Sequence, residues 1–210
     1  MGVGWVGVRA VIALAVLAAA CVVCATYAEE AGESEAQPAA MGSAGEAARS
    51  GESFPGAPSF EVEDQFRVRH AFTFPRAKAT ALVLGDRKSG RQGEKWAQAL
   101  WDRYERAIIL EGMGVGRGVP KWERPVIRFI LRKITPYAIL LDWDGRVGRA
   151  YGFERKKPNV VVIDAAGRIR LKYAGVVNAE SKEKVFAVLD GLVAEAGRAK
   201  RASPSRSASP

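Results

Sequence analysis

Residues 158–169, Pro158-Asn-Val-Val-Val-Ile-Asp-Ala-Ala-Gly-Arg-Ile169, decide the fold that the sequence predicts. Val160–Ile163 is a run of four β-branched residues, which is typical of a short buried strand. A second apolar strand is predicted over 169–173, and Asp164-Ala-Ala-Gly167 between them is a turn sequence. This stretch therefore predicts an antiparallel hairpin.

Strand and helix patterns alternate on both sides of this hairpin. In residues 90–104, for example, Trp96, Leu100 and Tyr104 recur every four residues and give a helix one apolar face. Parallel strands joined by helices require right-handed crossovers, and the hairpin adds antiparallel strands. The sequence thus predicts an α/β fold with a central mixed sheet and helices on both faces. The other predicted elements are strands 80–85, 107–110 and 137–141 and helices 120–134, 147–151 and 181–193.

Two stretches of the chain carry a family resemblance. Residues 140–153 contain a strand that ends in an Asp-x-x-Gly turn and is followed by Ala-Tyr-Gly, and residues 158–169 combine a proline, an apolar strand and a second Asp-x-x-Gly turn. In this order they resemble the thioredoxin-like superfamily, in particular its alkyl hydroperoxide reductase/thiol-specific antioxidant (redoxin) branch. The resemblance covers about residues 66–195 and implies a thioredoxin-like central mixed β-sheet flanked by helices.

The resemblance also implies a cis bond between Lys157 and Pro158, which would place that loop against the family's active-site motif. The alternative is an ordinary trans proline at the start of an edge strand. Residues 112–118 are rich in glycine, but their spacing does not match the Gly-x-Gly-x-x-Gly of dinucleotide-binding proteins. We expect these glycines to form a loop.

The family's thiol chemistry is missing from the segment between strand 80–85 and helix 90–104. In the family, a cysteine here is activated by the helix N-terminus. By register, Ser89 and Gln92 stand where a thioredoxin has its two cysteines. Serine cannot replace a thiolate in disulfide exchange near neutral pH, so the site is degenerate. We expect no catalytic residue, no metal and no cofactor.

The same segment is a polar loop before a helix, and the free N–H groups of a helix start favour anions. It is interpreted either as a solvated turn or as a site for a carboxylate or phosphate. Its residues are Asp86, Arg87, Lys88, Ser89, Gly90, Arg91 and Gln92.

Both cysteines, Cys21 and Cys24, lie in an N-terminal leader over residues 1–28. Its single basic residue, apolar run and small residues before Glu29 indicate a signal peptide cut after Ala28. Two alternatives are a lipoprotein box ending at Cys21 and an uncleaved membrane anchor. All three interpretations predict export to the periplasm or the outside of the cell. The lipoprotein and the uncleaved anchor would also tether the chain to the membrane.

Three further segments follow the leader. Residues 29–58 are rich in Ala, Gly, Glu, Ser and Pro and predict a disordered linker. Residues 59–195 form the predicted domain, and residues 196–210 a disordered basic tail. The whole chain is 48% hydrophobic and 26% charged, which excludes a fibrous or wholly disordered protein.

Helix 120–134 combines an apolar face, which we expect in the core, with a basic face. The basic face is interpreted as solvated, or as a contact for an anionic membrane surface or an acidic partner. Its residues are Lys121, Arg124, Arg128, Arg132 and Lys133. Export argues against nucleic acid as a partner.

Taken together, these features predict an exported, redox-inactive binding or accessory module at the cell envelope, with an unknown protein partner. The alternative is a thiol-dependent redoxin or antioxidant oxidoreductase that uses Cys21 and Cys24 or a partner's thiol.

Overall fold

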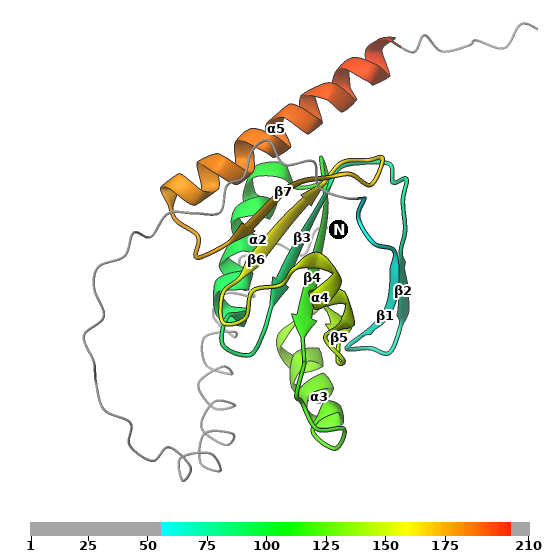
Figure 1. The fold of residues 1–210 in the computed structure, drawn as a ribbon, viewed down its shortest axis with the longest axis vertical. Coiled ribbons are helices and arrows are strands. Elements are labelled where there is room, and N and C mark those ends of the chain that lie inside the picture. The colour runs from blue at the N-terminus through cyan, green and yellow to red at the C-terminus, as the bar shows by residue number, and fades with distance from the viewer. Residues whose placement is uncertain (1–55, 203–210) are drawn as a thin grey trace, which may run out of the picture. The chain divides into compact units, whose positions relative to one another are not determined.

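The structure is a computed structural model and describes residues 56–202. Its seven strands form one sheet in the order β2-β1-β5-β4-β3-β6-β7 (Figure 1). The strands are β1 (Phe60–Asp64), β2 (Arg69–Phe72), β3 (Thr80–Gly85), β4 (Ile109–Val115), β5 (Leu140–Asp142), β6 (Asn159–Ile163) and β7 (Ile169–Ala174). The helices are α2 (Gly90–Tyr104), α3 (Arg124–Ile134), α4 (Arg146–Tyr151) and α5 (Ala179–Ala202).

The sheet is mixed, as the sequence predicts. Strands β3, β4 and β5 are parallel, whereas β6 and β7 form the antiparallel hairpin on one side and β1 and β2 form another on the other side. All seven strands belong to one compact unit, with α2, α4 and α5. Residues 121–137, which include α3, belong to a second unit and are described by themselves.

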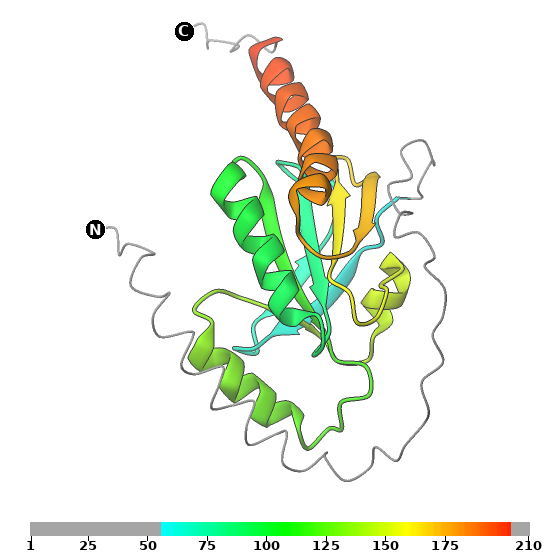
Figure 2. The same cartoon turned by 90° about the vertical axis from the view of Figure 1, so that its left-hand side faces the viewer.

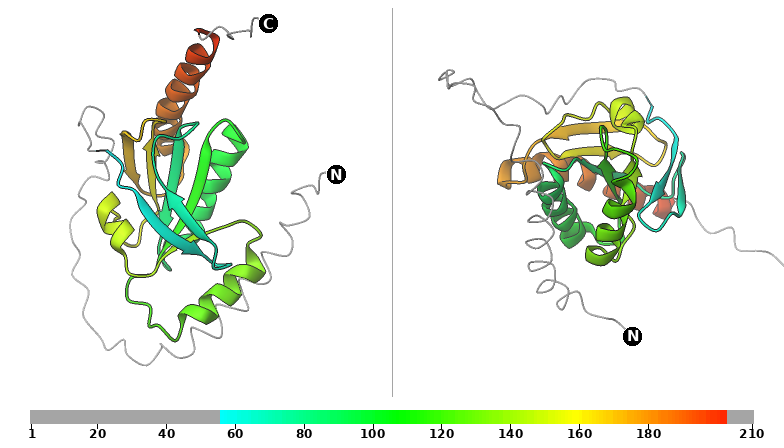
Figure 3. Two further views of the ribbon diagram at one scale, coloured as in Figure 1. Left: turned by 90° about the vertical axis from the view of Figure 1, so that its right-hand side faces the viewer. Right: turned by 90° about the horizontal axis from the view of Figure 1, so that it is seen from below.

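Each face of the sheet has its own hydrophobic core, because side chains along a strand alternate between faces. On β3, Val83 packs with Trp96 of α2 and Leu189 of α5, whereas Leu84 packs with Tyr151 of α4. Figure 2 shows α2 and α5 together in front of the sheet, and Figure 3 shows α4 on the opposite face. Helices therefore cover both faces.

Two predicted domain boundaries are wrong. Residues 56–58, assigned to the linker, are bound to the fold: Ala57 N–H donates to Gly167 O at 2.7 Å, and the Tyr151 hydroxyl donates to Pro58 O at 2.7 Å. Residues 196–202, assigned to the tail, continue α5, because this stretch consists mainly of good helix formers and the next proline is Pro204. The leader, most of the linker and the end of the tail lie outside the described residues.

The loop predicted over the glycine run is wrong for Gly112 and Gly114, which lie in a strand, whereas Gly116 and Gly118 follow that strand. Strand β4 runs through Gly112 and Gly114, which pair with Val83 of β3 and Leu141 of β5. Backbone hydrogen bonds on both sides hold it, so the pairing depends on neighbours that are distant in the sequence. Strands β1 and β2 were not predicted at all. Within residues 56–202, no helix is long and apolar enough to cross a membrane.

Candidate functional site

The loop between β3 and α2 is closed by Asp86 and Ser89. One carboxylate oxygen of Asp86, Oδ1, accepts the N–H of Lys88 at 3.0 Å and both the N–H and the hydroxyl of Ser89 at 2.9 Å. The Ser89 hydroxyl oxygen in turn accepts the N–H of Asp86 at 2.9 Å. Ser89 is 1% exposed, so its hydroxyl belongs to the turn and is not open to a substrate.

A second loop lies directly against the first. The N–H of Lys156 donates to the other carboxylate oxygen of Asp86, Oδ2, at 2.8 Å. The side chain of Asn159 shapes this second loop: its oxygen accepts the N–H of Glu154 at 2.9 Å, and its amide group donates to the carbonyls of Glu154 and Lys157 at 2.8 Å. The loop before β6 therefore lies against the loop before α2, as the family resemblance implies.

The implied cis bond before Pro158 is wrong. Within residues 56–202 the cis peptide bond is Phe74–Pro75, and Lys157–Pro158 is trans. The chain turns here by other means, because Lys156 adopts a positive φ of 66° and the side chain of Asn159 holds the neighbouring carbonyls. Pro158 itself is buried.

A third loop, after β7, joins the second. The N–H of Gly175 donates to Pro158 O at 3.0 Å, and the indole N–H of Trp96 in α2 donates to Gly175 O at 2.9 Å. A side chain at position 175 would require Tyr173 to move, since a Cβ there would lie 2.7 Å from the hydroxyl of Tyr173. We call these three segments, residues 86–91, 154–158 and 175–176, the three-loop platform.

Asp86 is the electrostatic centre of the platform. Burial alone would raise its pKa, but the hydrogen bonds from Lys156, Ser89 and Lys88 outweigh burial and hold the pKa below its usual range. The carboxylate is therefore ionised at neutral pH. It lies at the start of α2, where the predicted anion site would be, so the chain supplies this anion itself.

The rim of the platform is cationic. Arg155 and Lys156 are exposed, while Glu154 is paired with Lys157 at 3.1 Å. Gly90 is also exposed and Gln92 is half-buried. Sequence reasoning missed Arg155, Lys156 and Gly175, although the charge run just before Pro158 was a usable signal. The exposed cations of the two joined loops are Arg87, Lys88, Arg91, Arg155, Lys156 and Lys157.

The exposure of the helix predicted over 120–134 differs in part from the one expected. Arg128, predicted on a solvated face, is 8% exposed, whereas Trp122 and Val126 of the apolar face are 74% and 52% exposed. Among the other cations, Arg124 is half-buried, and Lys121, Arg132 and Lys133 are exposed.

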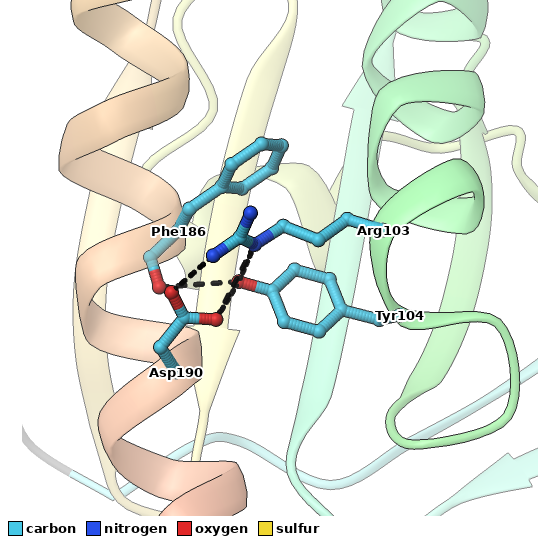
Figure 4. A network of polar contacts seen from close by, with 4 residues as sticks. All are labelled: Arg103, Tyr104, Phe186 and Asp190. Atoms are coloured by element: carbon cyan, nitrogen blue, oxygen red, sulfur yellow. Dashed lines mark hydrogen bonds and ion pairs between the residues drawn. The ribbon is translucent and has the colours of Figure 1, made fainter.

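The opposite end of α2 is fixed to α5 by a polar cluster (Figure 4). Arg103 pairs with Asp190 at 2.6 Å, and the Tyr104 hydroxyl donates to Asp190 at 2.8 Å and lies 3.1 Å from Phe186 O. Burial, followed by the hydrogen bond to Asp190, raises the pKa of Tyr104, so the phenol stays neutral. This cluster holds two helices together and presents no open reactive group.

The part of the chain that the structure describes contains no group of three His, Cys, Asp or Glu side chains that could hold a metal ion. The polar groups of the platform are the hydrogen-bonded Asp86 carboxylate and the exposed cations around it.

No protein family and no curated protein matches the sequence. Solved structures do match. They include a putative thiol:disulfide interchange protein DsbE from Chlorobium tepidum, with 17% identity and a TM-score of 0.51 over 66% of this chain and 98% of that one. The exposed lipoprotein thioredoxin Etrx1 from Streptococcus pneumoniae shares 13% identity, with a TM-score of 0.52 over 64% and 100% of the two chains.

A putative protein disulfide isomerase from Bacteroides thetaiotaomicron shares 16% identity, with a TM-score of 0.53 over 73% of this chain and 97% of that one. The chain has a thioredoxin-like fold. At these identities the likeness establishes the fold alone. The chain's two cysteines, Cys21 and Cys24, lie outside the described residues, so the thioredoxin-like domain over 56–202 contains none.

Proposed function

We propose that the chain is an exported, redox-inactive thioredoxin-like domain of the redoxin type that acts as a binding or accessory module at the cell envelope. The observation that carries this proposal is the closed turn before α2: Ser89, which by register stands where the family has a reactive thiol, is buried and hydrogen-bonded to the Asp86 carboxylate. Residues 140–153 and 158–169 support the redoxin type.

The chemistry of the turn argues against redox activity. Disulfide exchange needs a thiolate, and the domain has no cysteine to supply one. Ser89 is no substitute as a nucleophile, because its only acidic neighbour in the turn is Asp86, whose pKa is lowered. A carboxylate of low pKa is too weak a base to ionise a hydroxyl group.

The cationic rim supports binding to an acidic partner protein. Six exposed cations lie on two loops that a hydrogen bond from Lys156 to Asp86 holds together. Such a surface steers an acidic protein toward the platform and favours it over basic partners. We infer a partner with an acidic binding surface.

Redox activity is tested with the purified full chain in a disulfide reductase assay and a peroxidase assay. We expect no turnover above background in either. Activity that Cys21→Ser with Cys24→Ser abolishes would overturn the proposal in favour of the thiol-dependent redoxin. Activity that survives this double change would also overturn it.

Binding is tested by titration of the full chain with a glutamate-rich peptide. Arg155→Glu with Lys156→Glu should weaken binding about tenfold, because two attractive contacts become repulsive. The matched control, Arg198→Glu with Lys200→Glu on the exposed end of α5, should change it less than about twofold. Equal effects of the two pairs would show that the platform is not the binding surface.

Export is supported by the leader over residues 1–28. The names of two structural neighbours, a thiol:disulfide interchange protein DsbE and an exposed lipoprotein thioredoxin, agree with a place at the envelope. The intact mass of the protein from the exported fraction tests this. A chain that starts at Glu29 supports cleavage, and a chain found only in the cytoplasm contradicts export.

A further inference from the structure

An apolar stripe on α3 faces solvent. Trp122 in the preceding turn, Val126 and Phe129 are 74%, 52% and 56% exposed. Val126 and Phe129 are three residues apart within α3 and so lie on one side of the helix, and Trp122 lies in the turn that leads into it. Exposed apolar residues are ordinary when they are scattered, but a contiguous row of them marks an interaction surface.

Cations surround this stripe. Lys121, Arg132 and Lys133 are exposed, and the ammonium group of Lys133 lies 5.6 Å from the ring of Phe129. Residues 121–137 include a single acidic residue, Glu123, which is half-buried and has an interaction of its own. The surface thus combines apolar side chains with uniform positive charge.

This combination is complementary to a lipid bilayer with anionic headgroups. Aromatic and aliphatic side chains enter the boundary between headgroups and acyl chains, and lysine and arginine contact the phosphates. An acidic protein groove would match the charge, but a bilayer accepts the stripe without a preformed groove. Tryptophan is also the side chain most favoured at the membrane interface.

We propose that α3 lies flat on an anionic phospholipid surface, with Trp122, Val126 and Phe129 in the interface and Lys121, Arg132 and Lys133 at the phosphates. This inference goes beyond the proposed function, because it uses α3 and none of the residues of the three-loop platform. A failure of the redox or peptide tests above would leave it untouched.

The test uses the full chain in a Trp5→Phe background, which removes the tryptophan of the leader. The protein is mixed with vesicles of phosphatidylglycerol and phosphatidylcholine that carry brominated acyl chains, which quench tryptophan fluorescence within the bilayer. Trp122→Phe should abolish most of the quenching. The matched control Trp101→Phe, an exposed tryptophan of α2, should leave it unchanged.

The electrostatic part is tested by charge reversal. Arg132→Glu with Lys133→Glu should weaken vesicle binding at least about tenfold, because each cation near an anionic surface adds to affinity. Arg198→Glu with Lys200→Glu on α5 is the control and should change it less than about twofold. Added salt should also weaken vesicle binding of the chain that keeps Arg132 and Lys133, because salt screens the attraction between these cations and the anionic headgroups.

Three outcomes would overturn the proposal. One is quenching that Trp122→Phe does not reduce, and another is equal binding to vesicles of phosphatidylcholine alone. The third is a dimer, seen by sedimentation without lipid, that Phe129→Asp dissociates while vesicle binding stays the same. That result would assign the stripe to a second copy of the chain. Circular dichroism confirms that each variant is folded.

Discussion

Helices α2 and α3 have similar sequence patterns and opposite surroundings. Each has an aromatic and an aliphatic residue spaced one helical turn apart among basic residues. In α2, Trp96 and Leu100 are fully buried, whereas Trp122 and Val126 at α3 are more than half exposed. A periodic pattern therefore identifies an apolar face and does not say whether the protein's own core or something outside the chain covers it.

The difference follows from how each helix is connected. Four residues join β3 to α2, and the Asp86 turn with its bond to Lys156 fixes the start of the helix. The far end is fixed by Tyr104 and Asp190. At α3, eight residues separate β4 from the helix. The predictions below test this contrast, from the largest expected effect to the smallest.

Trp96→Ala should cost about 3–5 kcal/mol of unfolding free energy, because it leaves a cavity in the core. The change also leaves Gly175 O without the indole N–H that it accepts at 2.9 Å. Urea unfolding followed by circular dichroism measures the loss. A loss close to that of Trp122→Ala would remove the basis of the contrast between the helices.

Asp86→Asn should cost about 1–3 kcal/mol, since the N–H groups that the carboxylate accepts lose a charged partner. Folding lowers the pKa of Asp86, so its stabilisation is present above the unfolded value near 4 and disappears as pH falls through the folded value. Unfolding of both proteins at pH 7 and at lower pH measures this. The stability difference should shrink toward acid pH.

The control for this change is Asp102→Asn, an exposed carboxylate on the same helix. It should have less than about 0.5 kcal/mol of effect at pH 7. If the difference between the wild-type chain and Asp86→Asn stays constant or grows as pH falls, the ionised carboxylate is not what closes the turn.

Tyr104→Phe should cost about 1 kcal/mol, because it removes one hydroxyl from between α2 and α5 and leaves the ring in place. The same change combined with Asp190→Asn should cost less than the two single changes added together, since the two groups share one hydrogen bond. Additive losses in a double-mutant cycle would mean that Tyr104 and Asp190 do not act together.

Trp122→Ala should change the unfolding free energy by less than about 0.5 kcal/mol, because this side chain is 74% exposed. We expect Trp122→Ala to weaken vesicle binding and to leave the stability of the fold almost unchanged. A destabilisation comparable to that of Trp96→Ala would show that α3 packs into the fold, and the exposed stripe would then not be a docking surface.

Much of the candidate site could be predicted from the sequence. The loop before α2 and the loop before β6 were predicted from an apolar strand, a helix start and a family resemblance, all of which are carried by neighbouring residues. The bond from Lys156 to Asp86 could not be predicted, because it joins residues 70 positions apart. The place of Gly175 in the site could not be predicted either, because its backbone is hydrogen-bonded to Pro158 and Trp96, which are also distant in the sequence.

The sequence by itself determined the α/β class, the hairpin after Pro158 and the absence of a thiol from the domain. These depend on composition and on periodicity over a few residues. Only the tertiary structure decided that the glycines of β4 form a strand, that the Lys157–Pro158 bond is trans and that Trp122, Val126 and Phe129 are exposed. Each of these depends on which distant segments lie alongside, and a local pattern does not contain that information.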